Sequence, residues 1–169
     1  MPRRILFVCT GNICRSPTAE GVARGLAEKL GLDEHFEFDS AGTHGYHVGD
    51  TPDPRTIAAA ARRGYELAHL RARRVTDFDF IRFDHVIAMG RDHLDWLRRA
   101  CPPLYHDKLG LLLEFSARFE EDEVPDPYYG GVDGFELVLD LVEDAAQQLI
   151  RQLAANYLDT VPGIPPRTK

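Results

Sequence analysis

The stretch Val8 to Pro17, VCTGNICRSP, gathers reactive and anion-binding residue types within one short turn. Cys9 supplies a thiol, Arg15 supplies a guanidinium group six residues later, and Ser16 supplies a hydroxyl directly after it. A C-x5-R pair can arise by chance, so the pair alone is weak evidence for a site. The serine after the arginine, an apolar run before the loop and a helix start after it make the pattern more specific.

Such a loop can bind a tetrahedral dianion and attack it. Between a strand and a helix N-terminus, the five intervening residues can curl so that successive backbone N–H groups point inward. Arg15 offers a planar fork for two phosphate oxygens. The same positive field should favour the thiolate of Cys9 at neutral pH and make it a nucleophile. Gly11 permits the turn, and Asn12 can hold it by side-chain hydrogen bonds while tolerating a left-handed conformation.

The cysteines also allow plainer interpretations. Cys9 can be a small buried hydrophobe beside a surface Arg15, since cysteine is often simply buried. The change from strand to helix around Cys9 favours the anion-binding loop over that alternative. Cys14 has two open roles: it can pack at the junction of loop and helix, or it can trap an oxidised Cys9 as a reversible disulfide and prevent deeper oxidation.

The elements next to the loop follow from local signals. Residues 5–8 are continuously apolar and rich in β-formers, which is typical of a central strand buried on both faces. Ser16 is a candidate helix cap, Pro17 fits the first helical position, and Gly31 ends the helix. We therefore expect the loop to join a buried strand to a helix N-terminus.

Strands and helices alternate through the rest of the chain. Further strands are expected over residues 36–39, 85–89 and 109–113, and further helices over 54–64, 92–100 and about 135–157. The last helix carries one apolar stripe with spacings of three and four. This order predicts an α/β fold, a parallel sheet with right-handed crossovers and helices on both faces. Ligands bind at the carboxyl ends of the strands in such sheets, which is where the loop after residue 8 lies.

Length and composition predict one soluble domain. The 169 residues suit a single domain over 1–160, followed by a proline-rich tail, 161–169, that we expect to be extended and mobile. Three cysteines and no export signal predict reduced thiols and a cytoplasmic location. No apolar run approaches the roughly 18 residues that a membrane span requires. The net charge of −7 argues against a nucleic-acid partner.

Two other groups of residues have ordinary interpretations. The basic clusters Arg62–Arg63 and 71–74 are expected to form a solvated face rather than a polyanion site, since such charge runs are common on surfaces. His44, His47 and Asp50 could suggest a metal site. The H-x-x-H pair lies in a loop and has no third ligand at helical spacing, so the sequence predicts ordinary loop residues there and no metal site.

The loop and four later segments together resemble the low-molecular-weight protein tyrosine phosphatases. The matching segments are FVCTGNICRSPTAE, SAGTHGYHVGDTPDPR, HLRAR, VIAMGR and VPDPYYGG, within residues 4–155. The resemblance implies a four-stranded parallel sheet of the flavodoxin-like, phosphatase I type. It also implies hydrolysis of phosphotyrosine in proteins through a cysteinyl-phosphate intermediate, with inorganic phosphate as product, by a monomer that needs no metal or cofactor.

The same resemblance implies roles for individual residues. Cys9 is the nucleophile, Arg15 binds phosphate and the transition state, and Asp126 is the general acid. Asn12 and Ser16 order the loop, and Ser16 also supports the thiolate. The substrate-binding residues implied are Thr10, Gly11, Asn12, Ile13, Cys14, Ser16, Tyr46, Tyr128 and Tyr129.

An isolated aspartate is usually a solvated surface group, but the leaving group of this reaction requires a general acid such as Asp126. A tyrosyl leaving group has a pKa of about 10, so a carboxylic acid should protonate it as it leaves. Pro125 and Pro127 fix the backbone on either side of Asp126. Acidic neighbours at 121–123, if close in space, would keep more of its carboxyl protonated.

The aromatic residues and three departures from the family pattern remain. Tyr128 and Tyr129 either pack on the last helix or, as the resemblance implies, form a cleft wall beside the substrate ring. Gly90 and His93 stand where relatives usually have Asp and Asn. His69 lies one position earlier than the histidine that relatives use to brace the loop, so that role is not transferred to it.

Two competing functions are weighed against the phosphatase. A thiol-dependent arsenate reductase needs a further pair of closely spaced cysteines, and Cys101 has no nearby partner in the sequence. A non-catalytic reader of phosphate or phosphotyrosine would not need the nucleophile. Intact Cys9, Arg15 and Asp126 favour the enzyme.

Overall fold

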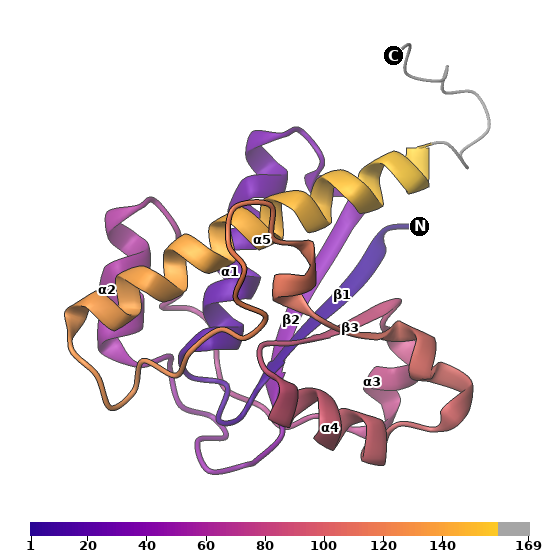
Figure 1. The fold of residues 1–169 in the computed structure, drawn as a ribbon, viewed down its shortest axis with the longest axis horizontal. Coiled ribbons are helices and arrows are strands. Elements are labelled where there is room, and N and C mark those ends of the chain that lie inside the picture. The colour runs from indigo at the N-terminus through magenta and orange to yellow at the C-terminus, as the bar shows by residue number, and fades with distance from the viewer. Residues whose placement is uncertain (159–169) are drawn as a thin grey trace.

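The computed structural model describes residues 1–158, with side chains to residue 156, and contains one four-stranded parallel sheet in the order β2-β1-β3-β4 (Figure 1). The strands are β1 (Arg3–Cys9), β2 (Phe36–Gly42), β3 (His85–Ala88) and β4 (Leu109–Leu111). The α-helices are α1 (Arg15–Lys29), α2 (Pro54–Arg62), α3 (Asp77–Arg82), α4 (Arg91–Ala100) and α5 (Val132–Leu158). Short 3₁₀ helices are η1 (Asp33–His35), η2 (Pro103–Lys108) and η3 (Leu112–Phe115). The predicted tail at 161–169 lies outside the described residues.

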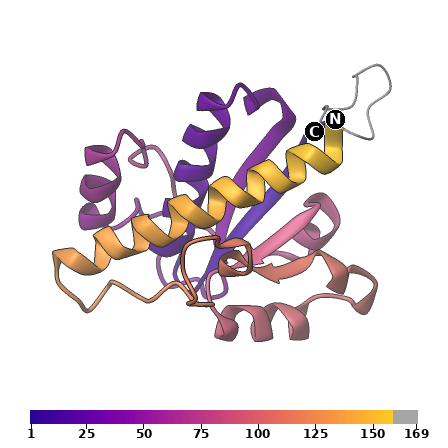
Figure 2. The ribbon, with the colours of Figure 1, turned by 45° about the horizontal axis from the view of Figure 1, so that its top comes forward.

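Strand β1 is buried on both faces, as its continuous apolar run predicts. Ile5 and Phe7 face a core built with α1 and α5, whereas Leu6 and Val8 face a second core built with α3 and α4. Helices α1, α2 and α5 accordingly lie on one side of the sheet and α3 and α4 on the other (Figure 1). Figure 2 shows the long α5, coloured orange to yellow, running across α1 on that side of the sheet.

The carboxyl ends of the strands meet at one edge of the sheet. Cys9 is in register with Gly42 of β2, and Val8 is in register with Ala88 of β3. Just beyond the strands, the Thr43 backbone N–H donates to the Cys9 carbonyl at 2.9 Å and the Met89 N–H donates to the Val8 carbonyl at 2.9 Å. The segments that follow β1, β2 and β3 are therefore held side by side.

Several element boundaries differ from the sequence predictions. Helix α1 begins at Arg15 with Cys14 at its N-cap, so the predicted cap at Ser16 is wrong, and Pro17 falls at the third helical position. The Ser16 hydroxyl bonds elsewhere, as described below. Gly31 and Gly64 end α1 and α2 with φ of 68° and 87°, as predicted.

Two further differences have local causes. The fourth strand is three residues long because its predicted second half, from Leu112, turns into η3. Helix α3 was not predicted: it spans six residues, too few for an apolar period to show. Its signal is a capping box in which Thr76 and Asp79 bond each other's backbone N–H groups.

Arg62, Arg71 and Arg74 of the basic clusters are exposed, as expected, whereas Arg63 and Arg73 are partly buried and join elements together. Arg63 of the connection after α2 bonds Glu136, Asp140 and Glu143 of α5 at 2.5 to 2.9 Å. Arg73 bonds both Asp39 and Asp79 at 3.0 Å. Among residues 1–158, no helix combines the length and apolar character needed to cross a membrane.

Gly42 offers a test of how tightly the strand ends hold the loop after β1. A Cβ on Gly42 would lie 2.6 Å from the Thr10 carbonyl oxygen and 3.0 Å from that of His44. Because backbone cannot move aside as a side chain can, Gly42→Ala should lower the free energy of unfolding by about 1–3 kcal/mol in urea titrations.

Gly45→Ala is the matched control. A Cβ there meets nothing closer than 3.6 Å, so its effect should stay within about 0.5 kcal/mol. Equal stability of the two variants would show that the loop is not clamped at Gly42.

Candidate active site

A cleft of about 250 Å³ lies at the carboxyl end of β1 and brings most of the predicted site residues together. The predicted residues that line it are Cys9, Thr10, Gly11, Ile13, Cys14, Arg15, Tyr46, Asp126, Tyr128 and Tyr129. His47, which the sequence analysis did not select, completes the lining. The two remaining predicted residues, Asn12 and Ser16, are buried beneath the loop at 2% and 0% exposure.

Asn12 organises the buried side of the loop. Its backbone is left-handed, with φ of 58°, as predicted for this position. The Arg73 backbone N–H donates to Asn12 Oδ1 at 3.0 Å. A backbone N–H can only donate, so this contact fixes which end of the amide is oxygen. Asn12 Nδ2 then donates to Ser16 Oγ at 2.8 Å and to Ser40 Oγ at 2.9 Å.

The direction of these hydrogen bonds determines what the Ser16 hydroxyl can do. Since Ser16 Oγ accepts from Asn12, its own proton is free to be donated. The Cys9 Sγ atom lies 3.0 Å from Ser16 Oγ, whereas the Ala41 carbonyl oxygen lies at 3.5 Å. The hydroxyl is therefore placed to donate to the sulfur, which favours negative charge there.

Ser40, the other serine that accepts from Asn12, connects this hydrogen-bond network to the carboxylate of Glu20. Ser40 Oγ donates to Glu20 Oε1 at 2.7 Å, and Arg24 donates to Glu20 Oε2 at 2.8 Å. Burial raises the pKa of Glu20, and the bonds from Ser40 and Arg24 act in the opposite direction. Asn12, Ser16, Ser40 and Glu20 thus each have hydrogen-bond partners, as buried polar groups require.

The cysteines occupy different environments. All three are free thiols, and Cys9 is 3% exposed at the floor of the cleft. Burial raises the pKa of Cys14 to about 12, so it is a thiol at neutral pH. Cys14 is 6% exposed and lines the same cleft as Cys9, so its packing role and its trapping role both stay predictions.

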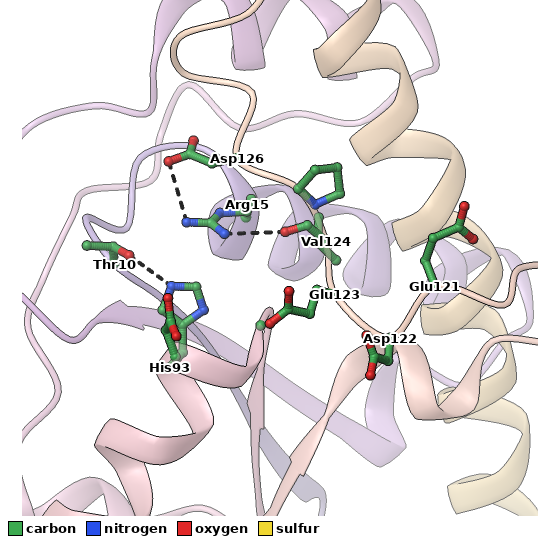
Figure 3. Close-up of a pocket in the computed structure, with 11 residues that line it drawn as sticks. Thr10, Arg15, His93, Glu121, Asp122, Glu123, Val124 and Asp126 are labelled. Atoms are coloured by element: carbon green, nitrogen blue, oxygen red, sulfur yellow. Dashed lines mark hydrogen bonds and ion pairs between the residues drawn. The ribbon is translucent and has the colours of Figure 1, made fainter.

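Arg15 connects the loop to the segment that carries Asp126 (Figure 3). Its Nη1 donates to the Val124 carbonyl at 3.3 Å, and its Nη2 lies 3.7 Å from Asp126 Oδ2. Asp126 Oδ1 accepts the backbone N–H of Tyr128 at 3.0 Å. The carboxyl is half-exposed and faces the cleft, so it can reach a group bound above Cys9.

Aromatic side chains form the walls of the cleft. The rings of Tyr128 and Tyr129 meet edge to face with centroids 4.9 Å apart, and Tyr46 stacks on His44 at 5.3 Å. Arg55 contacts the first of these tyrosines: it donates to the Tyr128 carbonyl at 3.0 Å and its guanidinium lies over the Tyr128 ring. Of the two interpretations of Tyr128 and Tyr129, the structure favours the cleft wall.

The departures from the family pattern have distinct outcomes. His93, at the start of α4, reaches the loop: its Nε2 lies 2.8 Å from Thr10 Oγ1. Burial, with a smaller contribution from Arg15, lowers the pKa of His93 to about 4, so the ring is neutral at pH 7. His69 is exposed and, among its described contacts, has none with the loop, so it does not brace it.

Ser40, Glu20, His47 and His93 are site residues that sequence reasoning did not place in the site. Ser40 and Glu20 reach the loop only because β2 and α1 pack against β1, and His93 only because β3 pairs with β1. A single sequence gives no local signal for these contacts.

The buried ring of His93 predicts a specific dependence of stability on pH. Its folded pKa, about 4, lies below the ordinary 6.5, so the unfolded chain binds the proton first as pH falls. Between about pH 7 and about pH 4.5 the protein should lose about 2 kcal/mol of unfolding free energy through this group. In His93→Gln, which keeps a polar partner for Thr10, that loss should be absent. Urea titrations at both pH values measure it, and parallel pH dependence in the two proteins would contradict it.

Comparison with known proteins agrees with this geometry. The family model described as low molecular weight phosphotyrosine protein phosphatase matches residues 4–158. A protein-tyrosine-phosphatase of this class from Streptomyces coelicolor is 47% identical, over 89% of this chain and 93% of the relative. The human phosphatase is 38% identical, over 80% and 86%. A crystal structure of a protein tyrosine phosphatase from Entamoeba histolytica superposes with a TM-score of 0.89, at 41% identity over 92% of this chain and 99% of the other. The chain belongs to the low-molecular-weight phosphotyrosine protein phosphatase family.

Proposed function

We propose that this chain hydrolyses phosphotyrosine in proteins, with Cys9 as the nucleophile. The observation that carries the proposal is the set of three reactive groups in one cleft, with a hydroxyl bonded to the sulfur. Cys9, Arg15 and Asp126 all line the cleft, and Ser16 Oγ lies 3.0 Å from the sulfur. Family membership supports the same activity.

In the first step, the Cys9 thiolate attacks phosphorus and the bond from phosphorus to the tyrosyl oxygen breaks. Asp126 donates its proton to that oxygen, so tyrosine leaves as a neutral phenol rather than as phenolate. The product on the enzyme is a cysteinyl phosphate. The Ser16 hydroxyl favours the thiolate before attack, and the loop with Arg15 binds the phosphoryl oxygens.

In the second step, Asp126 acts as a base. Its carboxylate, now ionised, takes a proton from a water molecule as the water oxygen attacks phosphorus. The sulfur–phosphorus bond breaks, inorganic phosphate leaves, and the Cys9 thiolate returns. The same residue serves both steps because the first step leaves it in the protonation state that the second requires.

In this proposal, the other cleft residues bind the two parts of the substrate side chain, the phosphate and the phenyl ring. Thr10, Gly11, Ile13 and Cys14 offer backbone N–H groups to the phosphate, and Asn12 and Ser16 hold the loop from below. Tyr46, Tyr128 and Tyr129 offer aromatic faces to the phenyl ring. We propose that the enzyme is cytoplasmic, as its cysteine content suggests, and that it acts as a monomer without a metal or cofactor.

The competing arsenate reductase finds no support in the position of Cys101. Cys101 lies in the core formed with α3 and α4, whereas Cys9 and Cys14 lie in the core on the other face of the sheet. Cys101 therefore cannot continue a disulfide exchange that starts at Cys9.

The role of Cys9 predicts that Cys9→Ser abolishes turnover of p-nitrophenyl phosphate at mildly acidic pH. We expect a loss of more than about a thousandfold in kcat, because a serine hydroxyl is a much weaker nucleophile than a thiolate. Cys101→Ser, the control, should keep full activity. Activity that survives in Cys9→Ser would reject the mechanism.

The role of Asp126 predicts a dependence on the leaving group. Asp126→Asn should slow hydrolysis of phenyl phosphate by about 10²–10⁴-fold, since the phenolate is expelled without a proton. Esters with strongly acidic leaving groups should lose much less. Asp133→Asn, an exposed acid of α5, is the control. Equal losses on both ester types would remove Asp126 from the acid role.

A further inference from the structure

A second cavity adjoins the catalytic cleft. Thr10, Arg15 and Asp126 line both, so the two spaces meet at these residues. Figure 3 shows the residues that line the second cavity. The volume of the second cavity is about 550 Å³, compared with about 250 Å³ for the cleft. Its remaining walls come from the start of α4 and from the segment that precedes Asp126, and the residues are Gly90, Asp92, His93, Glu121, Asp122, Glu123, Val124 and Pro125.

The cavity is strongly acidic. Five of its lining residues are carboxylates, and the one lining cation is Arg15. Arg15 pairs with Asp126, and Arg91 pairs with Asp122. The remaining three acids, Asp92, Glu121 and Glu123, form no ion pair within the described part of the chain. A concave wall of one charge sign concentrates the potential and attracts a group of opposite charge.

His93 provides an independent indication of a ligand. Its ring lines the cavity and is 5% exposed, and Nδ1 has no hydrogen-bond partner within the described residues. When Nε2 donates its proton to Thr10, Nδ1 of the neutral ring is left as an acceptor. A buried acceptor without a donor is uncommon, and a ligand N–H would supply one.

The backbone leaves this space open at Gly90. A Cβ built there would lie 3.5 Å from His93 Nδ1 and 3.6 Å from Glu123 Oε1, which is ordinary contact. The glycine is therefore not required by crowding. It leaves the space beside these two atoms free of a side chain. Glu123 Oε1 accepts the Arg91 backbone N–H at 2.7 Å, so His93 Nδ1 is the one of the two without a partner within the described residues.

We propose that the acidic cavity is a substrate subsite that binds the cationic side chain of an arginine or lysine near the phosphotyrosine. Ammonium and guanidinium groups only donate hydrogen bonds, which matches a wall made of acceptors. Three extended residues span about 10 Å, so a basic residue within three positions of the phosphotyrosine can reach from the cleft into the cavity. The proposal rests on the proposed hydrolysis of phosphotyrosine, which places the substrate peptide at the junction.

A peptide series tests the subsite. Phosphotyrosine peptides carry Arg, Gln or Glu at each of the three positions on either side, and kcat/KM is measured for each. At one or more positions Arg should exceed Glu by about tenfold at low ionic strength, with Gln between them. High salt should reduce the difference, because the partners are partly exposed.

Matched variants locate the effect. Asp92→Asn combined with Glu121→Gln removes two acids without an ion pair from the cavity and should remove most of the preference for Arg, measured as the ratio of kcat/KM for the Arg and Glu peptides. Asp33→Asn combined with Glu34→Gln makes the same change in net charge on η1, before the start of β2 and therefore at the opposite edge of the sheet. That control should keep the preference in full.

The outcomes separate this proposal from the catalytic one. Turnover that ignores peptide charge, or equal loss of preference in both double variants, would overturn the subsite and leave the phosphatase mechanism intact. Failure of the catalytic mechanism would appear as peptide turnover that survives Cys9→Ser. Peptide affinities of Cys9→Ser, measured by fluorescence anisotropy, report the charge preference without turnover. An affinity that does not depend on charge would also overturn the subsite.

Discussion

The hydrogen bond from Ser16 to the Cys9 sulfur depends on a contact made far from it in sequence, between the Arg73 backbone N–H and Asn12 Oδ1. That N–H cannot reverse its role, so it fixes the orientation of the amide and, through it, the direction of every bond beneath the loop. Reversal of the amide would set Arg73 N–H against an NH₂ group. Arg73 lies in the segment between α2 and α3. The packing of that segment against the loop therefore sets the direction in which the Ser16 hydroxyl donates, toward Cys9.

The same sulfur is placed by the alternation of strand β1. Cys9 follows Ile5 and Phe7 on the face toward α1 and α5, so its side chain lies against an apolar core and only 3% of it is exposed. Apolar packing alone disfavours charge on sulfur. The Ser16 hydroxyl and the N-terminus of α1 act against that penalty from the polar side. The loop must therefore combine rigidity with donors, which explains why its buried polar groups are satisfied.

The sequence predicts the parts of this arrangement that are encoded locally. The apolar run 5–8, the stripe of the last helix and the glycines that end α1 and α2 each lie within their own segment, and their predictions are confirmed. Ser16 was wrongly predicted as a cap because a serine oxygen can serve a helix N–H or another partner, and only the tertiary contacts decide. The link from His93 to Thr10 spans strands β1 and β3, so no local pattern contains it.

Arg15 lies where the cleft and the acidic cavity meet, and it contacts Asp126. In the proposed mechanism, phosphate binding therefore changes what the Asp126 carboxyl faces. Asp126 Oδ1 already accepts the N–H of Tyr128, so a proton on this carboxyl belongs on Oδ2. Oδ2 is also the oxygen nearest to Arg15 Nη2, at 3.7 Å. That separation is longer than a hydrogen bond, so the guanidinium gives up only a weak contact with Asp126 when it turns to a phosphate dianion. Once it turns, Oδ2 faces the bound substrate instead of the guanidinium, which is the place from which this carboxyl can pass a proton to the leaving-group oxygen.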